Sequence, residues 1–416
     1  MRNENIDLSW LRNTLGPGVI FASTAIGVSH LVQSTRAGAD YGFGLLIFVI
    51  IANILKYPFF EFSSRYASVT GTSIIEGYNE LGKYALWSYL IITLFSMLFI
   101  TSAVGAVTVG FLQNLFNTSE YGMWNHFVAL CICGLILSLG KYDYLDRLIK
   151  IIGTALLLST MVAFILILFK GPMNNDLIPV VEYNRKDIFF IIALMGWMPT
   201  AVDLSSWNSL WVLEKIKLTK YRPLLSQTLF EFNIGYISAA ILAVCFVTLG
   251  AYLMYGTDIS FSDSSALFAN QVINLYTKSI GSWSYLIISA SGFSIMFGTC
   301  IAVFDGYARS TCECIRLVQT KQNHYKFYYD LVIWFLVLGT CGIIYFFGSK
   351  IKQLVDLATT ISFLIAPIVA MANYRLVNFP YLSKDSIPPF WLRSLAVLGI
   401  IYLSLFSIIF IYFKII

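Results

Sequence analysis

Long runs of apolar residues, broken by short polar stretches, account for most of the sequence. A helix needs about 20 mostly apolar residues to cross the hydrocarbon core of a bilayer. The pattern therefore predicts an all-α integral membrane protein with eleven membrane-spanning segments. These segments are predicted at 10–38, 44–68, 84–115, 124–140, 147–170, 187–213, 226–256, 282–308, 327–347, 351–373 and 391–413.

Two of these segments lose their regular apolar pattern near the middle. In the first, small and polar residues gather at 27–30, and in the sixth a proline follows Trp197 and Met198. Backbone leaves its helix at membrane depth only where it is buried in protein or lines a wet cavity. Paired interruptions in the two halves of a chain are typical of a transporter's substrate site. The pattern predicts a secondary transporter that holds its cargo where the two interruptions meet.

The spacing of the interruptions indicates how the segments are organised. Segments one to five and six to ten form two halves of five helices, and each half begins with an interrupted helix. The first half covers about 10–170, the second about 187–373, and one extra helix follows at about 391–413. No polar or low-complexity linker divides the chain, so residues 1–416 are expected to form a single membrane transporter domain.

Composition and charge agree with a membrane location and indicate an orientation. Hydrophobic residues make up 58% of the chain and charged residues 12%, which excludes a soluble domain. Placing the N-terminus in the cytoplasm puts most of the 27 Lys and Arg residues on that side, in keeping with the positive-inside rule. We therefore expect a multi-pass protein of a bacterial-type inner (plasma) membrane, with a cytoplasmic N-terminus and a C-terminus outside.

Other features argue against catalysis, a resident metal and nucleic-acid binding. The net charge of +5 follows from the orientation, so no nucleic-acid partner is expected. Seven cysteines are scattered, and the closely spaced Cys312 and Cys314 lack a second pair to complete a zinc site. We expect a monomer in the lipid bilayer, with no catalytic residue, no metal site and no cofactor besides a coupling ion.

Several short motifs along the chain are similar to those of a known family. They are Gly16-Pro17-Gly18, Ala37-Gly38-Ala39-Asp40-Tyr41-Gly42, Val69-Thr70-Gly71, Met198-Pro199 and Ala290-Ser291-Gly292. On these motifs the chain resembles the Nramp family of divalent-metal transporters over nearly its whole length. The resemblance implies the LeuT-like fold of the APC superfamily, a 5+5 inverted repeat with helices 1 and 6 interrupted, plus one extra helix.

Where that family places its metal-binding residues, this chain carries different ones. The family's Asp-Pro-Gly-Asn motif falls on residues 27–30, which read Gly-Val-Ser-His, so the metal-binding aspartate is missing. The family's Met-Pro-His motif falls on 198–200, which read Met-Pro-Thr, and the acids of its proton path are absent from 101–105. Divalent metal ions need negatively charged oxygen ligands. A site selective for such ions is therefore not expected.

The residues at the interruptions favour a small anion instead. Unwound helices expose N–H groups and positive helix ends to the cavity, and Ser29, His30 and Thr200 add side-chain donors. We expect an Nramp-related bicarbonate-type transporter that imports a small inorganic anion together with Na⁺ by alternating access. The predicted substrate-binding residues are Gly27, Val28, Ser29, His30, Trp197, Met198 and Thr200.

Analogy with the LeuT-like fold adds a coupling site and charged candidates. Na⁺ is expected between the first interruption and hydroxyl groups of the eighth segment, which are those of Ser291, Ser294 and Thr299. Asp203, about one turn beyond the second interruption, is a candidate charge partner or proton carrier. Asp305 and Arg309 lie four residues apart on one helix and are expected to form a salt bridge or an inner gate.

Three other functions remain open on the sequence. The first is an H⁺-coupled transporter of Mn²⁺, Fe²⁺ or Mg²⁺ that uses backbone carbonyls, Met198 and neutral His30, with Asp203 as a further ligand. The second is a non-transporting membrane sensor on the same scaffold. The third is a carrier of amino acids or other organic solutes, which this fold also hosts.

Overall fold

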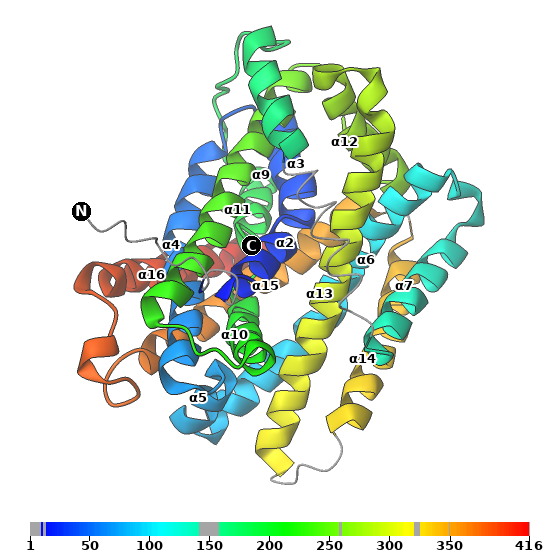
Figure 1. The fold of residues 1–416 in the computed structure, drawn as a ribbon. Helices are drawn as coiled ribbons and strands as arrows, with labels where there is room; N and C mark the ends of the chain where they lie inside the picture. The colour runs from blue at the N-terminus through cyan, green and yellow to red at the C-terminus, as the bar shows by residue number, and fades with distance from the viewer. Residues whose placement is uncertain are drawn as a thin grey trace, which may run out of the picture.

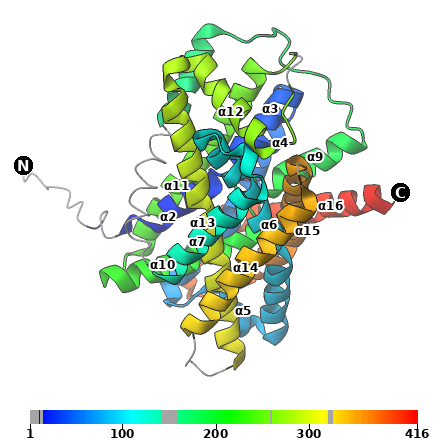
Figure 2. The same cartoon turned by 90° about the vertical axis from the view of Figure 1, so that its right-hand side faces the viewer.

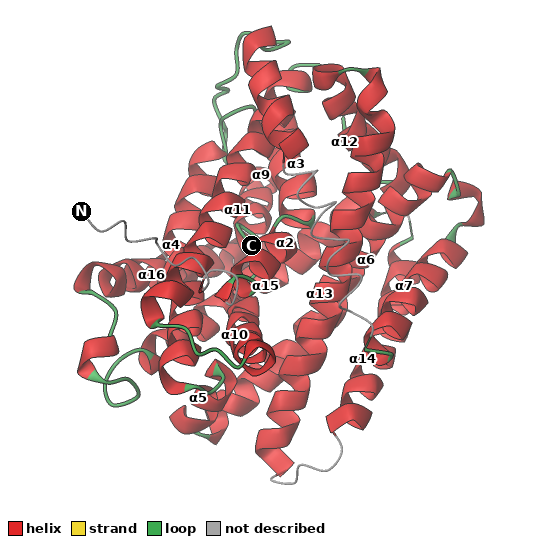
Figure 3. Cartoon of the chain, in the orientation of Figure 1, coloured by secondary structure: helices red, strands yellow, loops and turns green. Residues whose placement is uncertain are grey.

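The computed structural model describes residues 10, 14–140, 158–257, 260–319, 325–348 and 350–415. Within these ranges the chain consists of helices joined by turns and loops (Figure 1, Figure 3). The long helices are α4 (Leu46–Thr70), α6 (Lys83–Phe116), α11 (Leu225–Leu253), α13 (Tyr285–Gln319), α14 (Tyr325–Phe347), α15 (Ile351–Leu376) and α16 (Phe390–Ile415). Shorter helices are α5 (Ile74–Leu81), α7 (Met123–Ser138) and α12 (Ser265–Ile280).

Seven helical stretches in the described ranges are long and apolar enough to cross a membrane. They correspond to the second, third, and seventh to eleventh predicted segments. The fourth is the 16-residue helix α7, and the described part of the fifth is the helix Leu158–Lys170. The start of the fifth segment, at 147–157, lies outside the described residues. The first and sixth segments are the interrupted passages, and their separate pieces are too short to be counted as spans.

The first interrupted passage changes its helical geometry at the predicted place. Helix α2 (Pro17–Ala25) begins with a proline, whose fixed φ angle suits the first turn of a helix. It ends at Ile26, and a π-helical turn over Ser29–Ser34 leads into α3 (Thr35–Tyr41). Such turns are frequent at functional sites of helical proteins. The interruption at 27–30 is therefore present. The passage continues through the π-helical turn into the regular helix α3.

The second interrupted passage has a longer break. Helix α9 (Arg185–Gly196) ends at Trp197, and a short 3-10 turn at Val202–Leu204 leads into α10 (Ser205–Thr219). Pro199 lies between them and has no N–H to donate, so it cannot continue the helical hydrogen bonding. The predicted interruption at 197–200 is therefore confirmed.

Continuous helices surround the interrupted passages. Helix α6 packs along α13, α12 and α15, and α7 lies beside α14 in both views (Figure 1, Figure 2). Helix α11 lies against α2 and α3, α10 lies against α4, and α9 lies against α15. Helix α16 packs on α15 and α4 and leaves most of its surface exposed. The middle of each interrupted passage is therefore enclosed by protein.

Glycines let α11 approach both halves of the first passage closely. A Cβ on Gly38 of α3 would lie 1.9 Å from the carbonyl oxygen of Val247. On the other side of the interruption, a Cβ on Gly235 would lie 2.1 Å from the carbonyl oxygen of Gly18. Small residues allow this kind of close backbone approach between membrane helices. Helix α11 therefore holds α2 and α3 on either side of the interruption.

A carboxylate from α11 caps the beginning of α2. Glu231 is buried and accepts hydrogen bonds from the backbone N–H groups of Gly16 at 2.9 Å and Gly18 at 2.7 Å. Free N–H groups and the helix dipole attract negative charge to a helix N-terminus. A Cβ on Gly18 would also lie 2.4 Å from the carbonyl oxygen of Glu231. Capping and close packing against α11 together account for the Gly16-Pro17-Gly18 motif.

Replacing Glu231 by glutamine should lower the thermal stability of the purified protein. The amide keeps an acceptor oxygen but loses the charge that faces the helix N-terminus, and such interactions contribute about 1 kcal/mol. Scanning fluorimetry in detergent should show a melting temperature about 2–4 °C below that of the wild type. Glu120→Gln, at an exposed position, is the matched control. Equal melting temperatures for Glu231→Gln and the wild type would contradict the capping role.

Candidate functional site

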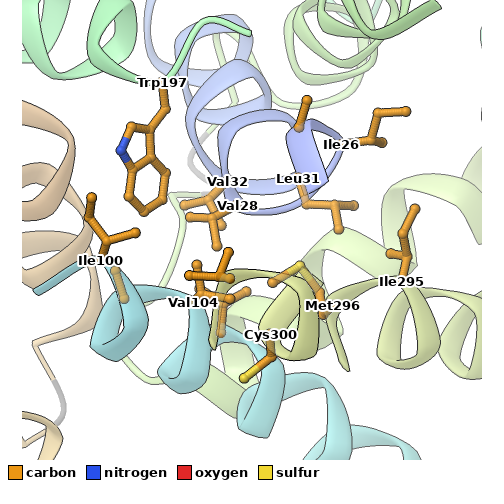
Figure 4. Packing of buried hydrophobic residues seen from close by; sticks show 14 of the residues in the cluster. Ile26, Val28, Leu31, Val32, Ile100, Val104, Trp197, Ile295, Met296 and Cys300 are labelled. Atoms are coloured by element: carbon orange, nitrogen blue, oxygen red, sulfur yellow. The ribbon is translucent and has the colours of Figure 1, made fainter. Parts of the chain in front are cut away.

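The two interruptions meet at a small buried cavity. Its volume is about 20 Å³, which is space for about one water molecule. Helices α2, α6 and α13 complete the wall, and Figure 4 shows Val28 and Val32 facing Val104 of α6, with the Trp197 ring nearby. The lining residues are Thr24, Val28, Ser29, Ile100, Val104, Trp197, Thr200, Leu204, Thr299 and Val303.

Four of the seven predicted substrate-binding residues line this cavity. Ser29 and Thr200 contribute hydroxyl groups, and Val28 and Trp197 contribute apolar surface. The Trp197 indole is fixed, because its N–H donates to the Oγ of Ser362 on α15 at 2.8 Å. The side chains at the two interruptions therefore offer the cavity neutral hydroxyl groups and an aromatic wall.

His30 and Met198, two more predicted substrate-binding residues, lie beside the cavity without lining it. The His30 ring points toward α11, where its Nε2 donates to the carbonyl oxygen of Ala239 at 2.8 Å. The other ring nitrogen, Nδ1, lies 2.7 Å from the Oγ of Ser29. The Met198 sulfur accepts a hydrogen bond from Ser34 Oγ at 3.6 Å. In this conformation both residues hold the interrupted backbone in place.

Gly27 and Thr299 mark the crossing of the first interruption and α13. A Cβ on Gly27 would lie 2.7 Å from the Cγ2 of Thr299, so the two segments touch. The Thr299 hydroxyl donates to the carbonyl oxygen of Ser23 at 3.0 Å, and its side chain lines the cavity. Ser291 and Ser294 lie more than one turn away on α13 and do not line the cavity. Of the predicted coupling-ion residues, Thr299 is the one at this crossing.

The side chains that line the cavity in the described part of the protein carry no formal charge. The described residues also contain no group of three or more His, Cys, Asp and Glu side chains that could hold a metal ion. Asp203 is buried between α6 and α13, where Oδ2 accepts from Ser96 Oγ at 3.4 Å and from the Tyr307 hydroxyl at 3.5 Å. Its Oδ1 has no hydrogen-bond partner among the described residues. Asp203 therefore belongs to a buried hydroxyl cluster next to the site.

A buried lysine outside the predicted site residues contacts the second interruption, whereas Glu61, the partner that the sequence suggested for it, pairs with Arg65. Lys56 of α4 is fully buried, and its ammonium donates to the carbonyl oxygens of Met195, Gly196 and Thr200 at 3.0, 2.9 and 2.8 Å. Carbonyls at the end of a helix lack partners within the helix. The signal for this contact was a lone lysine in an apolar segment, which marks a functional candidate in a membrane helix.

A vestibule of about 1090 Å³ lies between α3, α9, α15 and α16, and we call it the Arg36 vestibule. Arg36 forms a salt bridge with Asp356 of α15, with 2.7 Å between Nη1 and Oδ1. Gln33 donates to the same carboxylate at 3.0 Å, and the Arg36 guanidinium lies 4.8 Å from the centre of the Phe190 ring. The pair ties the first passage to α15. Sequence reasoning missed it because 320 positions separate the partners.

A second vestibule, of about 460 Å³, lies between α2, α10, α13 and α14, and we call it the Arg309 vestibule. Asp305 and Arg309 line it and form a salt bridge, with 2.7 Å between Oδ2 and Nε. The Tyr329 hydroxyl of α14 donates to Asp305 at 2.6 Å, and Glu214 of α10 lies 3.7 Å from Arg309. This cluster links three helices at the vestibule, an arrangement that suits a gate.

The two vestibules lie on opposite sides of the interruptions. The Arg36 vestibule is lined by α3, which follows the first interruption, and by α9, which precedes the second. The Arg309 vestibule is lined by α2, which precedes the first interruption, and by α10, which follows the second. The two interrupted passages therefore run in opposite directions, and the cavity lies between the vestibules.

Removing the charge of Asp356 should let α3 separate from α15 at the Arg36 vestibule. Asparagine keeps the size of the side chain but loses the ion pair with Arg36, which contributes on the order of 1 kcal/mol at a partly exposed site. A cysteine introduced at Thr360, which lines the vestibule, should then react roughly five-fold faster with an impermeant thiol reagent. Asp263→Asn removes the partner of Lys352, 3.5 Å away, and is the control. Equal labelling rates in the two variants would contradict the gating role.

Sequence comparisons identify the family. The chain matches the model of the Nramp family, described as natural resistance-associated macrophage protein-like, over residues 18–413. It is also 34% identical over 401 residues to an uncharacterized protein of Pasteurella multocida, and the match covers 95% of this chain and 91% of that protein. Both matches extend over nearly the whole chain.

Solved structures share the architecture. A manganese transporter of Eremococcus coleocola superposes with a TM-score of 0.71 at 12% identity, covering 98% of this chain and 88% of that one. MhsT in complex with L-phenylalanine superposes with a TM-score of 0.61 at 12% identity, covering 94% and 98%. At these identities the likeness shows the fold alone, and it confirms the predicted all-α, LeuT-like architecture. The chain therefore belongs to the Nramp family and is a multi-pass membrane transporter rather than an enzyme.

Proposed function

We propose that this chain is a secondary transporter of a small inorganic ion and works by alternating access. The observation that carries the proposal is the closed cavity at the two interruptions, set between two vestibules that each contain an Arg–Asp pair. Interrupted helices are typical of the cargo sites of such transporters. The cavity opens to the Arg36 vestibule when Arg36 and Asp356 separate. It opens to the Arg309 vestibule when α2 moves away from Thr299.

The comparisons support a divalent metal cation as cargo better than they support an anion. The family is that of the Nramp proteins, and one structural neighbour is a manganese transporter. In this chain such an ion would be bound by hydroxyl and carbonyl oxygens, because no acidic side chain lines the described cavity. Uncharged ligands compensate the loss of water from a divalent ion poorly. A divalent ion that keeps part of its water shell needs more than 20 Å³, and so does bicarbonate, so either cargo requires the cavity to widen on loading.

The donors of the site favour a second candidate, a small anion such as bicarbonate. Ser29, Thr200 and Thr299 line the cavity, and their hydroxyl groups can donate to an anion, although those of Ser29 and Thr299 must first release the carbonyl oxygens of Ala25 and Ser23. Lys56 already occupies the carbonyl oxygens that a cation would use at the second interruption. The positive charge of its ammonium repels a second cation and attracts an anion.

The charges of both vestibules support the anion candidate. The Arg36 vestibule is lined by five basic and three acidic side chains, and the Arg309 vestibule by three basic and two acidic ones. Basic side chains are in excess in both, and an excess of one sign of charge attracts ions of the opposite sign. The basic lining residues are Arg36, Arg185, Lys186, Lys352 and Lys414 in the first vestibule and Lys215, Arg309 and Lys326 in the second.

Na⁺ is the coupling ion that we assign to the anion candidate. An anion that enters a cell with a negative interior needs a driving ion, and Na⁺ binds hard oxygen ligands. The Thr299 hydroxyl and the Ser23 carbonyl bring such oxygens to the crossing of α2 and α13, 3.0 Å apart. The metal candidate would instead be coupled to H⁺, with the buried Asp203 as a carrier.

Uptake into proteoliposomes tests the proposal and separates the candidates. Labelled bicarbonate and internal pH are followed with and without a Na⁺ gradient, and Mn²⁺ quenching of a trapped dye is followed in parallel. Na⁺-driven bicarbonate uptake without Mn²⁺ movement supports the anion. Mn²⁺ uptake without Na⁺ and without bicarbonate movement supports the metal. If folded protein moves neither ion, the transport proposal is wrong and a sensor on this scaffold becomes the better hypothesis.

A further inference from the structure

Lys56 takes part in neither vestibule, yet it has a complete set of hydrogen bonds inside the protein. An ammonium group has three N–H donors. The structure gives each of them one carbonyl acceptor, on Met195, Gly196 and Thr200, at 2.8–3.0 Å. The side chain is fully buried, and the three carbonyls account for all of its donors. The ammonium is therefore held as a small ion is held, by backbone oxygens converging from several residues.

The acceptors come from both ends of the second interruption. Met195 and Gly196 close α9, and Thr200 follows Pro199 on the far side of the break. The last carbonyls of a helix carry the negative end of its dipole and need a donor or a cation when they are buried. The Lys56 ammonium is at once a hydrogen-bond donor and a cation, and it comes from α4, a helix that does not contain the break. The interruption thus keeps its shape because a cation from another helix bridges its two ends.

We propose that the Lys56 ammonium is a built-in cation that occupies the carbonyl site of the second interruption and determines which charge the neighbouring cavity accepts. Thr200 links the two, since its carbonyl oxygen accepts from Lys56 while the residue lines the cavity. The effect of Lys56 on the charge of the cargo rests on the proposed transport function. The binding of its ammonium by the three carbonyls does not depend on that function. A mobile cation cannot use these carbonyls while Lys56 holds them, and removal of the ammonium leaves a vacant cation site.

Chemical rescue with free ammonium compounds tests this assignment. Lys56→Ala removes the ammonium and leaves space for a primary alkylammonium ion. Purified in detergent, this variant should melt at least about 5 °C below the wild type, because the buried carbonyls of Gly196 and Thr200 lose the donor and Met195 loses its charged one. Methylammonium, ethylammonium or butylammonium chloride should raise its melting temperature, whereas choline chloride at equal concentration should not. The wild type should respond to none of them.

A second variant keeps the test decisive if Lys56→Ala does not fold. Lys56→Met fills a similar volume without the charge, so it should lose stability and should not be rescued by alkylammonium ions. Lys350→Met, at an exposed position, is the matched control and should melt like the wild type. A Lys56→Met protein as stable as the wild type, or a folded Lys56→Ala protein that ignores every alkylammonium ion, would overturn the proposal. The melting temperature does not depend on transport. A negative result in this test therefore contradicts the role of Lys56 and not the transport proposal, which the uptake assay tests separately.

Discussion

A single methyl group on Gly27 should reduce the initial rate of uptake roughly ten-fold or more while the protein stays folded. The added Cβ would lie 2.7 Å from Cγ2 and 3.0 Å from Oγ1 of Thr299. Thr299 cannot rotate away without losing its hydrogen bond to the carbonyl oxygen of Ser23. The first interruption and α13 must then move apart at the wall of a cavity of about 20 Å³. Overpacking of this kind costs about 1–3 kcal/mol, and 1.4 kcal/mol corresponds to a factor of about ten.

Two further variants show whether crowding against Thr299 is the cause. Gly342→Ala is the matched control, because a Cβ on Gly342 has no atom within 4 Å. Adding Thr299→Ser to Gly27→Ala removes Cγ2 and keeps the hydroxyl, so it should restore much of the uptake. Uptake is measured in proteoliposomes for the ion that the transport assay identifies, Mn²⁺ or bicarbonate. Normal uptake by Gly27→Ala would mean that this crossing does not form the cargo site.

Replacing Gly38 by alanine should prevent the chain from assembling into a stable protein. The added Cβ would lie 1.9 Å from the carbonyl oxygen of Val247 and 2.7 Å from the backbone nitrogen of Ala251. Both atoms belong to the backbone of α11, so no side-chain rotation relieves the clash. Helices α3 and α11 must separate along the interface that positions the first interruption. The cost should reach or exceed the upper end of the usual 1–3 kcal/mol for overpacking.

The fraction of monodisperse protein after extraction in detergent measures this effect. Gly38→Ala should elute mainly as aggregate, and any folded fraction should melt well below the wild type. Gly342→Ala should behave as the wild type, since an added Cβ meets open space there. A monodisperse Gly38→Ala protein with an unchanged melting temperature would show that α3 and α11 do not pack as described.

The sequence is sufficient to predict the features that depend on local pattern. Apolar length predicts α4, α6 and α11 within a few residues, because a membrane helix satisfies its backbone hydrogen bonds within itself. The interruptions are visible because Pro199 cannot donate an N–H group and small polar residues replace an apolar run at 27–30. The position of the small cavity follows as well, since Val28 and Thr200 lie at the two interruptions and both line it.

Long-range partners and side-chain directions could not be predicted in this way. Asp356 is 320 residues from Arg36, and Glu231 is more than 200 residues from the helix start that it caps, so no local period links them. Successive side chains along a helix point in different directions around its axis. His30 therefore points to α11 while its neighbour Ser29 lines the cavity, although both belong to the same short motif.

The claim that the cavity at the interruptions opens to one vestibule at a time can be tested with one cysteine. Val28→Cys, in a background without the native cysteines, is reconstituted into liposomes and labelled with an impermeant thiol reagent from each side separately. The account predicts labelling from both sides and protection by the ion that is transported. Adding Asp356→Asn should increase labelling from the side of the Arg36 vestibule and decrease it from the other side. Labelling from one side alone under all conditions, with no protection by that ion, would contradict the account.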